Sequence, residues 1–225
     1  MSATHPIVNP RPRSMRRGTG KPAGSVVNMP RDKKDPADRR EEILVATLDL
    51  IIASGVERLR ATDVAERLGV SSGLIFYHFD TIENLIVRAF EFAAERDLAH
   101  LDAVLAAADG TAESRLRTVL REYGPTGKAS GWRLWIESWS ASLHEPALRK
   151  VVAGLDGRWR EVVTELITEG VAAGVFTSPD PRGSAWRLTA LIDGLAVQNV
   201  ALDSTVTDAQ IADWVESALR FELGT

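Results

Sequence analysis

The sequence predicts an all-α protein, and three observations support this fold class. Apolar residues recur every three or four positions through most of the chain, which is the period of one helix face. Proline and glycine fall between these periodic segments, where they mark helix ends. No segment has the alternating apolar pattern that is typical of a half-buried strand.

Composition narrows the class of protein. Cysteine is absent from the 225 residues, which excludes a disulfide framework and thiolate metal chemistry and fits a reducing compartment. The longest apolar run, ILVATLDLIIA, is interrupted by Thr47 and Asp49 and is shorter than the roughly 18 residues of a membrane span. We therefore expect a cytoplasmic protein with no membrane contact.

Positive charge gathers at the start of the chain. Residues 1–40 carry ten Lys or Arg and three Asp, a net charge of +7 that leaves −11 for the rest of a chain whose total is −4. Prolines and glycines in residues 1–34 oppose an amphipathic transit helix, so we expect a disordered basic arm there. Such an arm suits a polyanionic partner, although basic tails are often merely solvated.

The first helix is expected between Pro36 and the turn at Gly55. Asp35 is the N-cap candidate, and proline is favoured at the first helical position. The apolar residues that share one face of this helix are Leu44, Leu48, Ile51 and Ile52. We therefore expect this helix to bury one apolar face against the core.

Two short helices are expected next. The segment ATDVAERLG has Thr62 as its expected N-cap and ends at Gly69, which tolerates the left-handed conformation of a helix end. The segment VSSGLIFYHF begins a new helix at Ser71 and turns Ile75 toward the core. Both helices are too short to be stable without packing.

A longer helix is expected over residues 81–105, with Asp80 as its cap and Glu83 completing a capping box. Beyond Gly110 the helical pattern continues to the end of the chain. Breaks are expected at Gly124-Pro125, residues 144–146, residues 178–181 and residues 204–207, with Asp180-Pro181 and Thr207 as helix starts.

Two short helices joined at Gly69-Val70, behind a longer helix, are the parts of a helix-turn-helix DNA-binding unit. A helix that enters the major groove, about 12 Å wide, needs small residues in its first turn. Ser71, Ser72 and Gly73 supply them, and their backbone amides attract a phosphate. The side chains expected toward DNA are Leu74, Phe76, Tyr77 and His78. Alternatively, these aromatics form an ordinary buried helix.

The span 40–86 resembles the N-terminal domain of the tetracycline-repressor (TetR) family. The matching features are Arg40, Ile43-Leu44, Gly55, Thr62, VAERLGVS, Gly73, Phe79 and ENLI. The resemblance implies that Thr62 and residues 71–77 approach DNA, with Tyr77 and His78 near its backbone. Family members often have Lys and Tyr where this chain has Ile82 and Phe76. The basic residues expected to compensate at phosphates or in the minor groove are Arg31, Lys33, Lys34, Arg39 and Arg40.

Residues 110–222 resemble, more loosely, the C-terminal domain of the choline-responsive (BetI-like) branch, through WRLWIESWSASLHEPALRKVV and GVAAGVF. Trp132, Trp135 and Trp139 share one helix face. This pattern predicts either core packing or the wall of a large apolar pocket for an unidentified effector. The polar residues proposed for that pocket are Arg133, Glu137, His144 and Gln198.

Small and apolar residues in register on two later helices predict close packing, within one chain or between two copies. They are Val163, Ile167, Gly170 and Gly174 on one helix, and Ala190, Gly194 and Ala201 on the next. A helix-turn-helix protein commonly presents two copies about 34–36 Å apart. The resemblance implies that the last helices form the dimer, so we predict a homodimer through these residues.

Together these features predict a ligand-responsive regulator, in which a homodimer binds a double-stranded DNA operator and a small-molecule effector tilts the helix 81–105 to release it. The expected parts are the basic arm (residues 1–34), the helix-turn-helix domain (35–80) and the ligand-binding and dimerisation domain (81–225). The alternative is a helical small-molecule-binding or adaptor protein that has lost specific DNA binding.

An enzyme is not expected, and neither is a cofactor. The four histidines are scattered, and no phosphate-binding glycine loop follows a strand. Asp97 and His100 are the nearest approach to a metal-binding pair. A helical di-metal site needs further carboxylates and a second such pair, which the sequence lacks, so we predict neither catalytic nor metal-binding residues.

Overall fold

The computed structural model describes residues 35–125, 130–202 and 206–224. Within them the chain forms nine helices and no strand, which confirms the all-α prediction. The predicted basic arm, residues 1–34, lies outside the described residues. The helices are α1 (Pro36–Ser54), α2 (Ala61–Leu68), α3 (Ser72–Phe79), α4 (Ile82–Ala107), α5 (Ala112–Tyr123), α6 (Ser130–Ser142), α7 (Pro146–Ala172), α8 (Pro181–Val200) and α9 (Asp208–Leu223).

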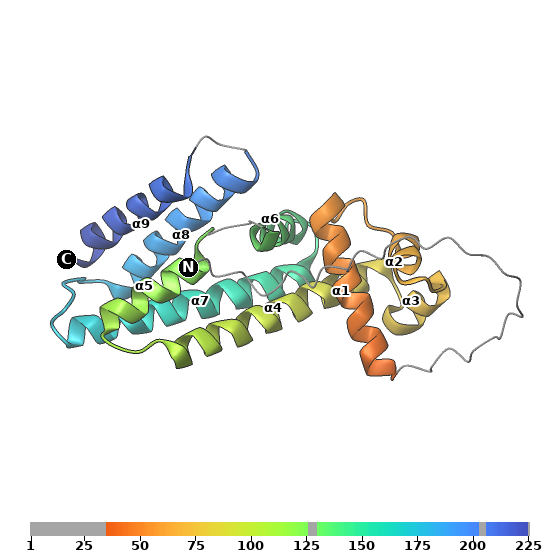
Figure 1. The fold of residues 1–225 in the computed structure, drawn as a ribbon, viewed down its shortest axis with the longest axis horizontal. Coiled ribbons are helices and arrows are strands. Elements are labelled where there is room, and N and C mark those ends of the chain that lie inside the picture. The colour runs from red at the N-terminus through yellow and green to blue at the C-terminus, as the bar shows by residue number, and fades with distance from the viewer. Residues whose placement is uncertain (1–34, 126–129, 203–205, 225) are drawn as a thin grey trace, which may run out of the picture.

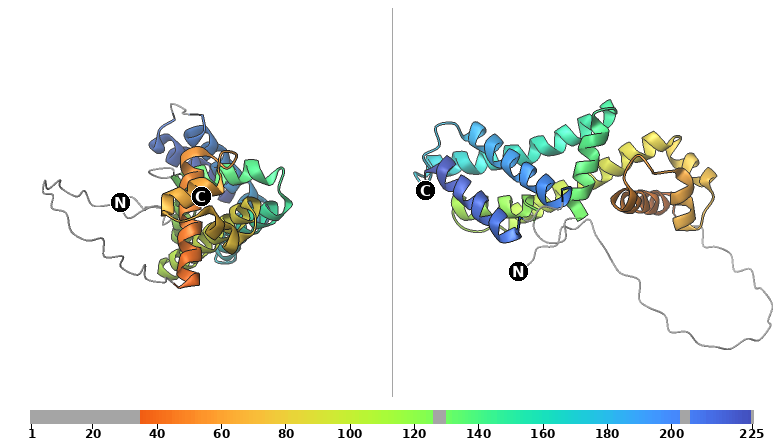
Figure 2. Two further views of the ribbon diagram at one scale, coloured as in Figure 1. Left: turned by 90° about the vertical axis from the view of Figure 1, so that its right-hand side faces the viewer. Right: turned by 90° about the horizontal axis from the view of Figure 1, so that it is seen from above.

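The first three helices gather at one end of an elongated molecule, and α5, α8 and α9 lie toward the other end (Figure 1). α4 and α7 pack against each other and run along the length of the molecule. α6 contacts both α1 and α7. Two further views show the same separation of the ends (Figure 2). α4 and α6 are therefore the elements that connect the two ends through α1.

Local signals account for the first helices. The Asp35 carboxylate accepts a backbone N–H of the first turn at 2.8 Å, as predicted for an N-cap. Gly55 follows the end of α1 at φ +84°, and Gly69 joins α2 to α3 in the left-handed conformation at φ +64°. Ile75 and Phe79 are buried on one face of α3, which packs against α2 and α4. The bend between α2 and α3 therefore lies where the glycine predicts it.

Two predicted caps are wrong. At α2, Arg60 takes the extended conformation that an N-cap requires, and Asp63 accepts its backbone N–H at 3.1 Å. Thr62 lies inside the first turn. At α4, Thr81 is the extended residue, and its hydroxyl accepts a backbone N–H at 3.1 Å. Asp80 instead ends α3 at φ +60°, a conformation unsuited to an N-cap.

The later helices begin as predicted. Asp180 accepts a backbone N–H of α8 at 3.0 Å, and Thr207 caps α9 with Gln210 in a capping box. Apolar side chains from all of the described helices form one continuous core, to which α9 contributes Leu219 and Leu223. Among the described residues, no helix combines the length and the apolar character that a membrane crossing needs.

Candidate nucleic-acid interface and ligand cavity

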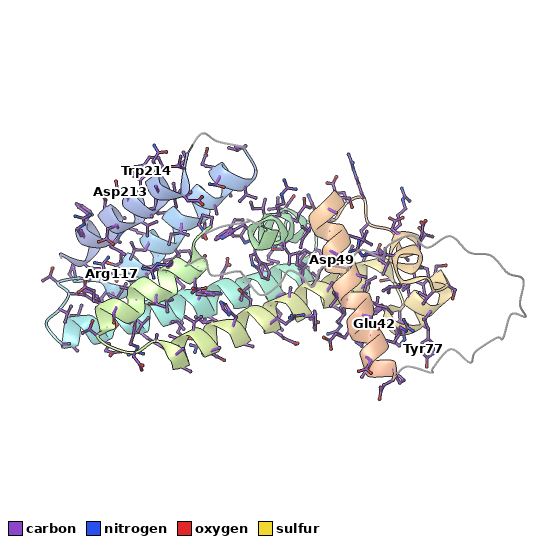
Figure 3. All side chains as sticks on the ribbon, viewed as in Figure 1. Glu42, Asp49, Tyr77, Arg117, Asp213 and Trp214 are labelled. Atoms are coloured by element: carbon purple, nitrogen blue, oxygen red, sulfur yellow. The ribbon has the colours of Figure 1, made fainter. Side chains whose placement is uncertain are left out.

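α3 has one buried face and one exposed face. Ile75 and Phe79 are buried, whereas Phe76 is 44% and Tyr77 80% exposed. Figure 3 shows Tyr77 at the end of the molecule formed by α1–α3. The alternative that these aromatics belong to the core is therefore wrong for Phe76 and Tyr77. An exposed aromatic pair on a short helix is a surface available to a partner.

The amino end of α3 is small and open. Ser71 is exposed and extended, and its side chain makes no capping hydrogen bond. Gly73 is exposed, and a Cβ atom added there would meet only the Ser71 Oγ at 3.7 Å. Ser72 and Leu74 are half-buried beside them. Since folding does not require glycine at position 73, the missing side chain leaves room for close approach of a ligand to the helix amides.

The start of α1 meets the end of α3. Arg40 Nη1 donates to the backbone carbonyl of His78 at 2.8 Å, and its guanidinium lies 4.4 Å from the centre of the Phe79 ring. Arg39 pairs with Glu42 at 2.7 Å. Partial desolvation, followed by the charges of Arg40 and Arg39, lowers the pKa of His78. Both arginines therefore have intramolecular partners in addition to their predicted place at the interface.

Two further positions of the predicted interface lie beside α3. Thr62 is exposed on α2, which packs against α3. Ile82 is half-buried against the core at the start of α4. An apolar residue packed there contributes to the fold and cannot bind phosphate.

A small cavity with aromatic walls lies between α4, α5, α6 and α7. Trp132, Trp135 and Trp139 of α6 line it, together with Tyr123 of α5 and Trp159 of α7. Neighbouring rings have centroids 5.2 to 5.9 Å apart. The free space inside it is about 30 Å³, which is room for one or two water molecules. The three tryptophans that were singled out in the sequence thus meet at one cavity.

Carboxylates complete the lining of this cavity. They are Asp97, Glu122 and Asp156, and the described lining residues include no Lys or Arg. Asp97 is buried and accepts the indole N–H of Trp159 at 3.0 Å. Glu122 lies 3.3 Å from the imidazole of His100. Aromatic faces beside carboxylates attract cations and repel anions.

A second layer of polar groups lies behind the cavity. The Tyr123 hydroxyl donates to Asp193 at 2.6 Å. Burial raises the pKa of Asp193 to about 6, and burial followed by the charge of Asp193 raises the pKa of Tyr123, so the phenol remains a donor. Burial also raises the pKa of Asp156, against the charge of Arg160. The charge of Asp193, behind the cavity, therefore changes near pH 6.

Three residues predicted for the pocket lie elsewhere. Arg133, His144 and Gln198 are exposed, and none lines the aromatic cavity. Successive helix residues are rotated by about 100°, so Arg133 points away from the face of its neighbour Trp132. It lines a separate hollow between α1 and α6, together with Glu137. The other two lie after α6 and on α8, outside the walls of the cavity.

For three residues, the predicted role in the dimer interface is wrong. Val163 and Ile167 are fully buried within the chain. Gly170 is buried too, and a Cβ atom there would lie 2.1 Å from the Phe176 ring. These residues pack α7 against its own chain, so they are unavailable to a partner. Gly174 is exposed in the turn after α7, where its φ of +71° favours glycine.

The residues predicted on α8 are exposed, and they have exposed aromatic neighbours. Ala190, Gly194 and Ala201 lie at the surface. Trp186 on α8 is 50%, Trp214 on α9 42% and Phe221 88% exposed. Figure 3 shows Trp214 on the outer side of α9. We call this set of α8 and α9 residues the α8–α9 face.

Six of the nine described residues that line the cavity were not predicted from the sequence. Asp97 had a usable signal, because it lies four residues from both Ala93 and Leu101 on an apolar face. A lone carboxylate in such a stripe indicates a buried polar contact. Tyr123 and Trp159 carried no such signal, since aromatic residues on an apolar face usually pack in the core.

No metal site appears among the described residues: no group of three or more His, Asp or Glu could hold an ion. Asp97 and His100 each have the separate partners given above, Trp159 and Glu122.

Known proteins resemble the chain over most of its length. A family model for the C-terminal domain of BetI-type transcriptional repressors matches residues 112–224, and the model of the bacterial regulatory proteins of the tetR family matches residues 43–89. The HTH-type transcriptional regulator BetI of Klebsiella pneumoniae (strain 342) is 27% identical over 192 residues, which cover 80% of this chain and 94% of that protein. Its counterpart in Escherichia coli (strain K12) is 28% identical over 178 residues, which cover 74% and 87%.

Solved structures have the same arrangement of helices. A candidate transcriptional regulator from Saccharomonospora viridis, in complex with choline, superposes with a TM-score of 0.78 at 26% identity and covers 83% of this chain and 98% of that chain. A TetR transcription regulator from Haloarcula marismortui ATCC 43049 has a TM-score of 0.74 at 24% identity, covering 83% and 99%. The second likeness concerns the fold alone.

Proposed function

Because the chain belongs to the tetR family of bacterial regulatory proteins, with a C-terminal domain of the BetI repressor type, we propose that it represses transcription as a homodimer and leaves its operator when an organic cation enters the aromatic cavity. The observation that carries this proposal is the joint presence of an exposed α3 face and an aromatic, acidic cavity in one chain. We infer that the protein is located in the cytoplasm, where it binds DNA.

The exposed side of α3 supports the DNA-binding part. Ser71 and Gly73 leave the helix amides accessible, which suits a phosphate. Tyr77 and Phe76 project from the next turn, where a phenol donates to phosphate and a ring packs on a sugar or a thymine methyl. His78, whose pKa is lowered, binds as a neutral donor. Arg40, through its bond to the His78 carbonyl, holds the end of this helix.

The α8–α9 face supports the homodimer. It combines small residues that allow two helices to approach closely with three exposed aromatic side chains. Exposed apolar patches of this kind mark protein interfaces. A two-fold contact through this face repeats α3 once in each copy, as two half-sites of an inverted repeat require.

The composition of the cavity supports a quaternary ammonium effector. Five aromatic rings and three carboxylates surround it, and aromatic cages of this kind bind choline-like cations. The Saccharomonospora viridis regulator is in complex with choline. The free space of about 30 Å³ is smaller than such a ligand, so binding has to displace α6 or its tryptophans. A ligand that binds a displaced state more tightly shifts the protein toward that state.

The proposal is tested by selecting bound duplexes from random DNA, then measuring how choline changes the affinity for the selected sequence. We expect an inverted repeat with half-sites about 34–36 Å apart or a multiple of it, and weaker binding when choline is added. The matched control ligand is 3,3-dimethylbutan-1-ol, which has the shape of choline without its charge and should leave DNA binding unchanged. No enriched sequence, or equal effects of the two ligands, would overturn the proposal.

A further inference from the structure

We propose that Glu137 is the positioning residue through which the cavity controls the DNA-binding helices. It would do so by holding the end of α1 to α6 in the ligand-free protein and releasing it when the cation enters. This inference rests on the proposed function, because it names how occupancy of the cavity reaches α3.

A side-chain hydrogen bond links α6 to the chain just after α1. Glu137 Oε2 accepts the backbone N–H of Val56 at 3.0 Å, across 81 positions of sequence. The same carboxylate lies 3.3 to 3.4 Å from the place where a Cβ atom of Gly55 would be. A larger residue at position 55 would crowd the carboxylate, so glycine there serves this contact as well as the turn at φ +84°.

α6 carries both the contact and the cavity wall. Glu137 lies between Trp135 and Trp139, and both of those side chains line the cavity. All three side chains extend from the same helix of 13 residues. A ligand that displaces α6 as a whole therefore also displaces the Glu137 carboxylate from Val56.

The surroundings of the contact leave room for such a displacement. An open hollow of about 350 Å³ lies where the end of α1 meets α6 and the end of α8. Its lining residues are Ile52, Ala53, Ser54, Gly55, Arg58, Arg133, Ile136, Glu137, Val200 and Ala201. Because this hollow is open, the Glu137 carboxylate has room to leave Val56 when α6 moves.

The position of α1 matters to α3 directly. Arg40, at the opposite end of α1, binds the His78 carbonyl and covers Phe79, so a tilt of α1 also moves α3. α4 offers a second connection, because it packs against both α1 and α7. Loss of Glu137 should therefore weaken the coupling between the two sites rather than abolish it.

The test compares operator affinity with and without choline in the wild-type protein and in Glu137→Ala, Glu137→Gln and Glu57→Ala. Couplings between sites are commonly about 5- to 150-fold, and we expect Glu137→Ala to lose most of the wild-type factor. Its choline affinity without DNA should not fall, because the ligand no longer has to break the Val56 hydrogen bond. Glu137→Gln retains an acceptor oxygen and should keep most of the coupling. Glu57, an exposed residue of the same turn, is the matched control.

Hydrogen exchange of the Val56 amide provides a second readout in the wild-type protein. Choline should accelerate this exchange, whereas a purely structural hydrogen bond would exchange at the same rate with and without the ligand. This readout decides the question if Glu137→Ala does not fold. Two results would overturn the inference and leave the proposed function intact. One is that choline weakens operator binding by Glu137→Ala as much as by the wild-type protein. The other is that the exchange rate of the Val56 amide is the same with and without choline. A wild-type protein that does not respond to choline overturns both.

Discussion

The two ends of the molecule assemble their functional surfaces in different ways. The exposed α3 face is one contiguous segment, Ser71 to His78, and a single helix presents it. The cavity instead takes its walls from four helices, through residues such as Asp97, Tyr123, Trp132 and Trp159. The surface proposed to read DNA is thus formed by local structure, whereas the proposed ligand site exists only after distant segments have packed together.

We call the part of the molecule around the cavity the packed half, or packed end. The largest expected effect is a loss of unfolding free energy when a side chain buried there is truncated. Ile167→Ala removes a fully buried side chain from α7, and such truncations cost about 2–5 kcal/mol of unfolding free energy. We expect this loss in chemical denaturation at every protein concentration. Stability that is unchanged, with a weaker dimer instead, would mean that Ile167 faces a partner copy.

The next substitution should change choline affinity without changing operator affinity, and so distinguishes the two ends of the molecule. Trp159→Leu removes the aromatic ring that lines the cavity, together with the indole N–H that binds Asp97, and a desolvated cation–π contact is worth about 2 kcal/mol. Choline affinity should fall by about tenfold or more, while operator affinity in the absence of ligand stays unchanged. Titration calorimetry and fluorescence anisotropy measure the two affinities. Trp214→Leu on the α8–α9 face is the control and should leave choline binding intact.

The converse substitution acts on α3. Tyr77→Phe removes one exposed hydroxyl, and a hydrogen bond to a charged group is worth about 1.5–3 kcal/mol. Operator affinity should fall by roughly tenfold and choline affinity should not change. If both affinities fell together, the separation of the two ends would be lost.

A further expected effect is a pH dependence of the unfolding free energy. Asp193 has a pKa of about 6 in the folded protein against an ordinary value of 3.8. Between these values the folded state holds a proton that the unfolded state has lost, so the unfolding free energy falls as pH rises through this window and levels off above it. Asp193→Asn should remove this slope in urea titrations. Asp213→Asn, at an exposed position on α9, should retain it.

Sequence patterns were sufficient to predict most of the helix ends and turns in the part of the molecule formed by α1–α3. Asp35, Gly55 and Gly69 act through neighbours a few residues away, so their roles as cap and turns could be predicted without any knowledge of tertiary contacts. Thr62 and Asp80 were misassigned because adjacent residues compete for one cap, and the backbone conformation of Arg60 and Thr81 decides the outcome.

Sequence patterns were insufficient to predict which residues of the packed end are buried. A stripe of apolar or small residues indicates a packing contact, but it does not show whether the contact is with the same chain or with another copy. Val163 on α7 and Ala190 on α8 belong to similar stripes, yet the first is buried and the second exposed. Likewise, Trp132 and Arg133 are neighbours, but only the indole reaches the cavity. Such distinctions depend on which helices pack together, as in the contact between Gly170 and Phe176.

The central claim is that the packed end controls the DNA-reading end. It is tested most directly by measuring the affinity of choline for the free protein and for the operator complex. Reciprocal linkage requires choline to bind the complex more weakly, by the same factor by which choline weakens operator binding, and this is the result we predict. Equal choline affinity for the free and the operator-bound protein would contradict the account.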